Sequence, residues 1–427
     1  MSIRIAPLLS TGYKYWGYKT SMNRACSSSC TRCKYGCRGV LSAGTYKDDK
    51  VFVYFHLILT DNCNLCCSYC RAKAFENLGD GDDETDPVEI DPALPAELEI
   101  DLPQLYNFLY RDPAAILTFY GGEPLLRADL IETITSTAPV QRFMLQTNAL
   151  LLDRLAPKTV NRFSTILVSI DGREALTDAN RGAGVYRKVI RNVNRIRANG
   201  FAGELIARMT VTERTDIVDA VSYLADNPDH SFSSIHWQLD ANFAGDFAHR
   251  NFAAWVHDSY NPGIQALVTA WIDQMEDTGK VLRWYPFLDP MEDLLTNRTS
   301  RLRCGSGYAN YSILTDGHIA PCPVMIGMKQ YYVGHIADAD PTRLPVISVN
   351  GECAECSIQM FCGGRCLYSN ITKPWRVEER RVVCDTVKNL HSALVGALPR
   401  ARSLINNGTV TLRDFSHEKF NGCEIIP

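Results

Sequence analysis

The sequence predicts an α/β protein with a parallel sheet, followed by a small cysteine-rich domain. Between residues 51 and 240, short runs rich in β-branched and aromatic residues alternate with helix-like segments. The sixteen cysteines fall mainly into three groups, with none between residues 71 and 303. A chain of 427 residues is long enough for two or three domains, and 46% apolar and 22% charged residues are typical of a globular protein.

Six strands are predicted in the first part of the chain, at residues 51–60, 115–120, 142–147, 166–170, 205–211 and 235–239. Helices are predicted between them at 104–110, 128–136, 185–198 and 217–225, with a shorter one at 151–155. The helix at 185–198 has the clearest 3.6-residue period, in Val185, Val189, Ile190, Val193 and Ile196. Alternation of strands and helices implies right-handed βαβ units. A long helical segment at 252–275 follows the last strand.

Three cysteines follow the first predicted strand with the spacing CxxxCxxC: Cys63, Cys67 and Cys70, with Tyr69 just before the last. Three thiolates can hold three irons of a 4Fe-4S cluster and leave the fourth iron open. An open iron can bind S-adenosylmethionine (SAM), and an electron from the cluster can then produce a 5'-deoxyadenosyl radical. Cys66 leaves a zinc site as an alternative, because Cys63/Cys66 and Cys67/Cys70 also form two CxxC pairs.

These residues resemble the radical SAM superfamily, in which CxxxCxxC with an aromatic residue before the last cysteine follows the first barrel strand. The resemblance implies that residues 51–300 form a partial (β/α)6 barrel and a bridge. The second predicted strand ends in Tyr120-Gly121-Gly122-Glu123-Pro124, which resembles the GGEP motif that receives the amino group of SAM. Glycines at this point would let the backbone approach a ligand closely.

Polar residues at the ends of later strands complete the SAM site that the resemblance implies. Side chains at the carboxyl ends of parallel strands converge on one mouth. We expect Asn148 and Ser169 to make polar contacts to SAM and Arg208 to bind its carboxylate, with capping, turn or ion-pair roles as the alternatives. The expected cofactor-binding residues are Tyr69, Gly121, Gly122, Glu123, Pro124, Asn148, Ser169, Asp171 and Arg208.

A second cysteine pattern starts at Cys304 and continues with a Gx4C at Cys322, a Cx2Cx5Cx3C that begins at Cys353, and Cys384. The order resembles the SPASM domain, which we place at residues 301–400, with a tail at 401–427. The resemblance implies two auxiliary 4Fe-4S clusters, one on Cys353, Cys356, Cys362 and Cys384 and one nearer the active site on Cys304, Cys322 and Cys366. The second lacks a fourth ligand, which Cys423 or a substrate thiolate could supply.

SPASM enzymes modify peptides or proteins, so the resemblance implies a peptide maturase with three 4Fe-4S clusters and SAM. The favoured product is a cysteine thioether, and carbon-carbon crosslinking or epimerisation is the alternative. Sulfatase-maturing relatives have an aspartate base where this chain has Pro323, which disfavours that oxidation, although Asp240 could act as a catalytic base. A ferredoxin or flavodoxin is the expected electron donor. Two alternatives outside this class are an iron-sulfur electron carrier and a zinc-bound scaffold. Both would use the cysteines, but a carrier would not need the Gly121–Glu123 or Ser169–Asp171 motifs.

Residues 1–50 do not resemble the start of a barrel. They contain Cys26, Cys30, Cys33 and Cys37 among Ser, Thr, Lys and Arg, with no apolar strand before them. Three interpretations remain open: a metal or cluster site, a substrate-like peptide on the enzyme's own chain, or a mobile tail. The segment is too short for the winged-helix leader-binding module of many such maturases.

The net charge and the lengths of the apolar runs argue against nucleic acid and membranes as partners. The net charge of −4 gives no general surface for nucleic acid, and no apolar run approaches the roughly 18–20 residues of a membrane span. The N-terminus lacks the apolar region of a signal peptide, so we expect a cytoplasmic protein. The acidic stretch at 79–101 is predicted to be a solvated loop rather than a calcium site, and lone histidines such as His56 and His236 are predicted to be core residues.

Overall fold

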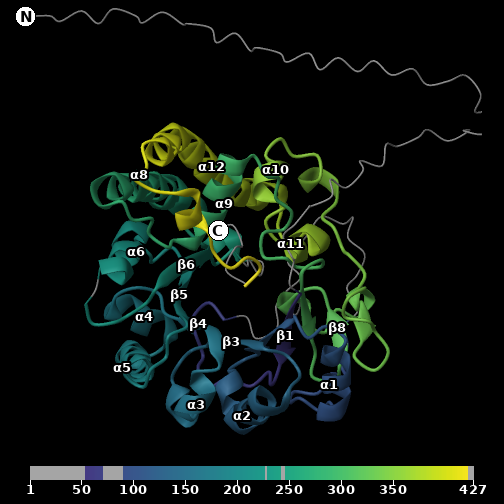
Figure 1. The fold of residues 1–427 in the computed structure, drawn as a ribbon. Coiled ribbons are helices and arrows are strands. Elements are labelled where there is room, and N and C mark those ends of the chain that lie inside the picture. The colour runs from purple at the N-terminus through teal and green to yellow at the C-terminus, as the bar shows by residue number, and fades with distance from the viewer. Residues whose placement is uncertain (1–52, 71–89, 227, 242–245, 422–427) are drawn as a thin grey trace, which may run out of the picture. The chain divides into compact units, whose positions relative to one another are not determined.

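The computed structural model describes residues 53–70, 90–226, 228–241 and 246–421 (Figure 1). The chain divides into two units, Met1–Lys50 and Val51–Pro427, and all described residues belong to the second. The four N-terminal cysteines and Cys423 lie outside the described residues, so the three interpretations of the N-terminal segment stay predictions.

A nine-stranded sheet in the order β6-β5-β4-β3-β2-β1-β7-β8-β9 is the centre of the described chain. Its first six strands pair in parallel and are β1 (Tyr54–Ile58), β2 (Ile116–Tyr120), β3 (Arg142–Thr147), β4 (Phe163–Ser169), β5 (Glu204–Val211) and β6 (Ser234–Leu239). The predicted parallel α/β sheet is therefore confirmed. Three further strands were not predicted: β7 (Asn310–Ile313) pairs in parallel with β1, and β8 (His318–Ala320) and β9 (Gly334–His335) follow antiparallel.

The helices between these strands are α1 (Leu102–Tyr110), α2 (Ala128–Thr137), α3 (Pro157–Val160), α4 (Glu174–Arg181), α5 (Val185–Ala198) and α6 (Ile217–Asp226). They lie along the outer face of the curved sheet (Figure 1). The face of α5 predicted from its period is buried, except that Ile190 is half-buried. The predicted helix at 151–155 is instead a 3-10 turn, Leu152–Arg154, before α3.

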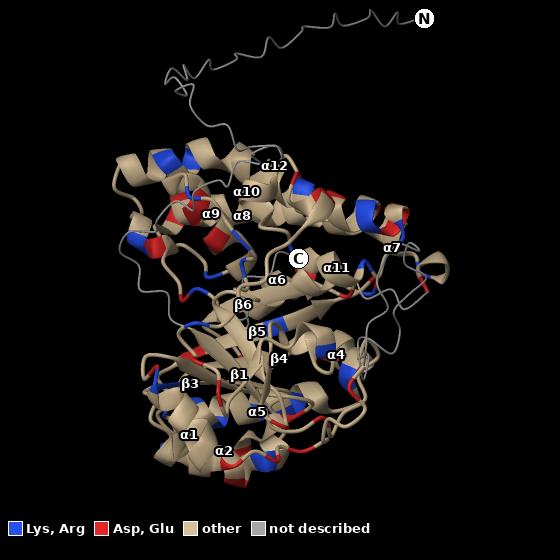
Figure 2. Ribbon diagram, turned by 90° about the vertical axis from the view of Figure 1, so that its right-hand side faces the viewer, with Lys and Arg blue, Asp and Glu red and all other residues tan. Residues whose placement is uncertain are grey.

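The helices after the sixth strand are α7 (Phe252–Trp255), α8 (Asn261–Thr278), α9 (Tyr285–Thr296), α10 (Gln359–Cys362), α11 (Leu367–Thr372) and α12 (Val377–Asn406). Figure 2 shows α8, α9 and α12 on the opposite side of the sheet from α1 and α2. The predicted helix at 252–275 is broken by a π-helical turn at Val256–Tyr260. The domain boundary predicted at residue 400 falls inside α12, which packs along α8 through the contact of Arg400 with Asp273.

The hydrophobic core has two parts, one on the outer face of the sheet and one on its inner face. Side chains that point outward pack against the helices, as Phe55 does on Phe108 of α1. A smaller group lines the inner face near the amino ends of the strands: Tyr54, Ile116, Met144, Leu167 and Ile206, joined by Tyr285. Phe420 packs against this group and belongs to residues 416–421, which we call the C-terminal segment. The chain end thus contributes to the interior of the barrel.

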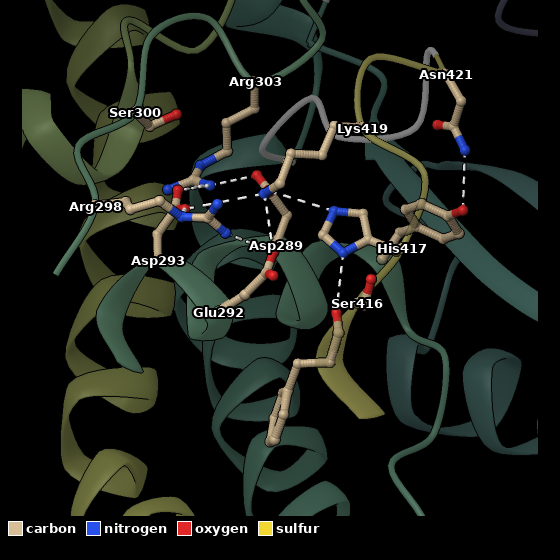
Figure 3. A network of polar contacts seen from close by, with 12 residues as sticks. Asp289, Glu292, Asp293, Arg298, Ser300, Arg303, Ser416, His417, Lys419 and Asn421 are labelled. Atoms are coloured by element: carbon tan, nitrogen blue, oxygen red, sulfur yellow. Dashed lines mark hydrogen bonds and ion pairs between the residues drawn. The ribbon is translucent and has the colours of Figure 1, made fainter. Parts of the chain in front are cut away.

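A buried network of charges attaches the C-terminal segment to α9 (Figure 3). Arg303 contacts Asp289 and Asp293 of α9, the latter at 2.8 Å, and Lys419 contacts Asp289 at 2.6 Å. Burial opposes ionisation of Asp289, but Arg303, His417 and Lys419 hold its pKa well below the usual range. Arg303 also donates from Nε to the carbonyl of Phe361, at 3.0 Å. It therefore connects the residues next to Cys304 with those next to Cys362.

Replacing Arg303 with Met should destabilise the protein strongly. The Arg303 side chain is 1% exposed, and its loss removes the most buried cation that both Asp289 and Asp293 contact, at a cost of about 3–5 kcal/mol. Urea unfolding of the anaerobic protein measures the effect. Arg400→Met, which removes an exposed pair with Asp273 and Glu276, is the control and should change stability far less. Equal losses in the two variants would show that the Arg303 network does not carry the expected energy.

Candidate active site

A cavity of about 450 Å³ opens at the carboxyl ends of the parallel strands. Its barrel wall includes Cys63, Cys67, Tyr69, Cys70, Gly121, Gly122, Glu123, Asn148, Ser169, Arg208 and Asp240. Its other wall comes from the cysteine-rich part of the chain: Val324, Arg365, Cys366, Tyr368, Ser369, Pro374 and Trp375. Of the predicted SAM-binding residues, Pro124 and Asp171 do not line the cavity.

The cysteine loop, residues 59–70, carries Cys63, Cys67 and Cys70 together on the barrel wall. Burial raises the pKa of Cys67 to about 11, and the charges of Cys70 and Cys63 add to the rise while Arg181 opposes it. Cys66 is exposed and is not part of the cavity lining. This donor set, three thiols on one short loop beside a cavity, fits a cluster held by three thiolates.

Gly121 and Gly122 allow the end of β2 to contact the cysteine loop. A Cβ on Gly121 would lie 2.3 Å from the carbonyl oxygen of Thr60, and one on Gly122 would lie 2.3 Å from that of Asn62. The backbone N–H groups of Gly122 and Glu123 donate to these two carbonyls, each at 2.8 Å. The close approach that the glycines permit is therefore to the chain itself, whereas the sequence analysis assigned it to a ligand.

The described part of the predicted acidic loop also binds the cysteine loop. Thr60 and Glu97 form an isolated β-bridge, and the Glu97 carboxylate accepts hydrogen bonds from Thr60 Oγ1 at 2.6 Å and Asn62 Nδ2 at 2.7 Å. Arg127 adds an ion pair at 2.8 Å. Residues 90–101 are thus not only a solvated surface loop, because one of their carboxylates holds the base of the cysteine loop.

The Glu123 carboxylate fixes the end of β3 through hydrogen bonds. It is 1% exposed and accepts hydrogen bonds from Thr147 Oγ1 at 2.6 Å and the backbone N–H of Asn148 at 2.8 Å. Asn148 in turn donates from Nδ2 to Asn64 Oδ1 at 2.7 Å, and the same nitrogen lies 3.9 Å from Cys63 Sγ. The next residue, Ala149, has a φ of 61°, in the left-handed region that favours glycine.

Asp171 lies behind the cavity and holds the far end of the cysteine loop. It is fully buried and pairs with Arg181 of α4 at 2.8 Å. The hydroxyl of Tyr69 donates to Asp171 Oδ2 at 3.0 Å, and the Arg181 guanidinium lies 5.4 Å from the centre of the Tyr69 ring. The backbone N–H of Ser68 donates to the carbonyl of Asn180 at 2.8 Å. Arg181 is thus a site residue to which the sequence analysis gave no role.

Arg208 and Asp240 occupy the cavity wall at the ends of β5 and β6. Arg208 donates from Nη2 to Gln238 Oε1 at 3.1 Å. Asp240 lies 3.4 Å from Arg250, which also pairs with Glu213 at 2.7 Å. Because Arg250 already binds its carboxylate, Asp240 is poorly suited to take a proton from a substrate. Ser169 lines the cavity at the end of β4.

The cysteines of the second pattern form two groups. The inner group is Cys304, Cys322 and Cys366, and the outer group is Cys353, Cys356, Cys362 and Cys384. Burial raises the pKa of Cys322, and the charges of Cys366 and Cys304 raise it further. Burial likewise raises the pKa of Cys362 to about 11, with Cys353 and Cys384 contributing. Cys366 alone among these seven residues lines the cavity.

Asn310 links the inner cysteine group to the barrel interior. Its Nδ2 donates to the carbonyls of Cys304 at 3.2 Å and Phe420 at 3.1 Å. Its Oδ1 lies 2.7 Å from Nδ1 of His56 on β1. His56 is 4% exposed and His236 is fully buried, so both are core residues as predicted.

The comparisons with known proteins match this architecture. Residues 57–219 match the family model of the radical SAM superfamily. A GTP 3',8-cyclase of Synechococcus elongatus is 31% identical over 30% of this chain and 36% of its own. An AdoMet-dependent heme synthase of Nitratidesulfovibrio vulgaris is 30% identical over 36% and 39%. The mycofactocin maturase MftC of Mycobacterium ulcerans is 26% identical over 39% and 42%. The chain thus covers less than half the length of each of these relatives.

A solved structure described as native anSMEcpe with bound AdoMet has the same fold, with a TM-score of 0.60 and 17% identity over 83% of this chain and 99% of that one. Residues 57–219 are thus similar to the radical SAM superfamily, and the chain shares the fold of this solved structure. Among the described helices, none has the length and apolar character to cross a bilayer.

Stability should depend on pH through His56. Burial lowers the pKa of this histidine from 6.5 to about 4, although the hydrogen bond with Asn310 opposes the shift. The unfolded chain therefore binds a proton that the folded chain rejects, so stability is complete above pH 6.5 and falls towards pH 4. At pH 5 the loss is about 2 kcal/mol. Urea unfolding at about pH 7.5 and pH 5 should show a smaller drop in His56→Gln, and an equal drop would contradict the assignment.

Replacing Gly122 with Ala should displace the cysteine loop, because the new Cβ would overlap the carbonyls of Asp61 and Asn62. We expect a loss of at least about 2 kcal/mol in urea unfolding. Gly396→Ala on α12 is the matched control, since nothing lies within 4 Å of its added Cβ, and it should be neutral or stabilising by about 0.5–1 kcal/mol. If both variants are as stable as the wild type, the glycine contact is not a steric requirement.

Proposed function

We propose that this protein is a radical SAM peptide maturase that removes hydrogen from a peptide carbon. The observation that carries the proposal is the cavity itself, which has the three thiols of the cysteine loop on one wall and Cys366 of the inner cysteine group on the other. A site between two cysteine groups suits a reaction that starts at one cluster and ends near another. The name of the similar MftC, a maturase, supports a peptide as the substrate.

The residues of the cysteine loop would hold the SAM-binding cluster. When bound, the cluster and SAM supply a 5'-deoxyadenosyl radical, which can remove hydrogen from a C–H bond that no side-chain base can deprotonate. The chain's own residues position this site: Asp171 and Arg181 hold Tyr69, and Glu123 holds the strand end that carries Asn148. Asn148, Ser169 and Arg208 line the cavity where the polar groups of SAM would bind, with Arg208 suited to its carboxylate.

The SPASM assignment and two auxiliary 4Fe-4S clusters are part of this proposal. The outer cysteine group offers four thiols and the inner group three, in support of one complete and one incomplete ligand set. Cys423 or a substrate thiolate would supply the missing ligand. A substrate thiolate next to Cys366 would leave a cysteine sulfur facing the reacting carbon, so a thioether is the favoured product. Carbon-carbon crosslinking or epimerisation is the alternative, and a ferredoxin or flavodoxin would deliver the electrons.

An oxidation like that of sulfatase maturases is less well supported. The residue after Cys322 is Pro323, which cannot act as a base, and Asp240 already pairs with Arg250. A general base in the cavity would need a carboxylate without such a partner. The identity of Pro323 and the pairing of Asp240 therefore weigh against this oxidation.

The test is anaerobic reconstitution with iron and sulfide, followed by SAM and dithionite, with 5'-deoxyadenosine measured by liquid chromatography and mass spectrometry. The wild type should form 5'-deoxyadenosine, and Cys67→Ser should not, because it removes a cluster ligand. Cys66→Ser is the matched control on the same loop and should keep the activity, since Cys66 does not line the cavity. Equal loss in both variants would favour the two CxxC pairs of a zinc site. No 5'-deoxyadenosine in the reconstituted wild type would refute the proposal.

The same reaction tests whether the N-terminal segment is the substrate. A proteolytic digest that covers residues 25–39 should then show the loss of a pair of hydrogens for each linkage, with cysteines that resist alkylation. Cleavage of SAM with an unchanged segment would place the substrate on another chain.

A further inference from the structure

Arg365 lies in the turn between α10 and α11, directly before Cys366, and its side chain lines the cavity on the wall opposite the barrel. Its φ is 52°, a left-handed conformation that is unfavourable in a residue other than glycine. The turn is fixed by close packing, because a Cβ on Gly363 would lie 1.7 Å from the carbonyl oxygen of Arg301. A strained residue held this firmly in a cavity suggests a functional role.

The other charged side chains of the cavity already have partners within the protein, and Arg208 donates to Gln238. Arg181 pairs with Asp171, Asp240 pairs with Arg250, and the Glu123 carboxylate accepts three hydrogen bonds. Within the described residues, Arg365 makes no ion pair, and its buried Nε has no hydrogen-bond partner. A buried N–H without an acceptor is unfavourable, so the geometry calls for an acceptor from a ligand.

Trp375 holds the guanidinium in a defined orientation. The Arg365 guanidinium carbon lies 5.6 Å from the centre of the Trp375 ring, and both side chains line the cavity. Stacking on an aromatic face leaves the edge of the guanidinium available for hydrogen bonds in its plane. That edge matches the two oxygens of a carboxylate, which a guanidinium can bind in a bidentate manner.

We propose that Arg365 binds a carboxylate of the substrate on the cysteine-rich wall of the cavity. The inference deepens the proposed function, since it names a feature of the peptide. Arg208 on the facing wall remains the partner for the carboxylate of SAM. The substrate group is an Asp or Glu side chain or a C-terminal carboxylate. The first 47 residues contain neither Asp nor Glu, so the site favours a substrate on another chain over the cysteines at 26–37.

A second role for Arg365 must be separated from this one. The outer thiols are its neighbours: burial raises the pKa of Cys362 and Cys384, and the charge of Arg365 opposes that rise. Arg365 would then serve as a counter-charge for the outer cysteine group, and its removal would alter the reduction potential of a cluster bound there. Peptide binding and cluster potential are therefore measured on the same variants.

The test uses the reconstituted, SAM-loaded protein and a panel of fluorescein-labelled twelve-residue peptides that contain Cys, Ser and Thr. The peptides carry Asp or Asn at a central position and end in an acid or an amide. Fluorescence anisotropy should show that the wild type binds one carboxylate form at least about tenfold more tightly than its amide counterpart. The form preferred identifies a side-chain or a terminal carboxylate.

Arg365→Met should remove this preference, and Arg365→Lys should keep part of it. Arg301→Met, which changes an exposed arginine outside the cavity lining, should keep all of it. A wild type that does not distinguish acid from amide overturns the proposal. So does an Arg365→Met protein that keeps the preference but shows a shifted cluster potential in an EPR-monitored redox titration. Because binding is read without turnover, a carboxylate preference in a protein that fails to cleave SAM would refute the proposed function alone.

Discussion

The buried ion pair between Asp171 and Arg181 is the interaction on which the cavity depends. The cysteine loop has no regular secondary structure after Thr60, so its shape comes from contacts with strand ends. The backbone N–H groups of Gly122 and Glu123 bind its start, and the Asp171 pair binds its end through Tyr69. A carboxylate taken out of water needs this full set of donors, because an unpaired buried charge is costly. The motif residues therefore fix the shape of the cysteine loop, and they affect a ligand through that shape.

One arginine links the inner and outer cysteine groups to each other and to α9. Arg303 precedes Cys304 of the inner group and binds the carbonyl next to Cys362 of the outer group, while its other contacts reach α9. Cys366 lines the cavity on the wall opposite the cysteine loop, together with a cationic group, Arg365, and an aromatic one, Trp375. Under the proposed function, this wall would select among peptides by charge without taking part in the chemistry.

The six parallel strands and the residues at their carboxyl ends could be predicted because both depend on local patterns. Residue type and alternation identify a strand, and parallel pairing then brings its end to the common mouth, as Asn148, Ser169 and Arg208 illustrate. β7 could not be predicted, since it is four residues long and its partner β1 lies about 250 residues earlier. Arg181 and Arg365 were missed for a similar reason. Each gains its role from a residue that packing, not sequence spacing, places beside it.

The C-terminal segment has a consequence for how the chain is made. Glu418 accepts a hydrogen bond of 2.6 Å from Tyr54, the first residue of β1, and also contacts Arg142 at the start of β3. These partners are separated by 364 and 276 residues. During synthesis the first strands leave the ribosome long before the residues that complete their interior. The barrel can reach its final form only after Glu418 and its neighbours have been synthesised, so the nascent chain passes through a stage with an incomplete core, at which chains are prone to aggregate.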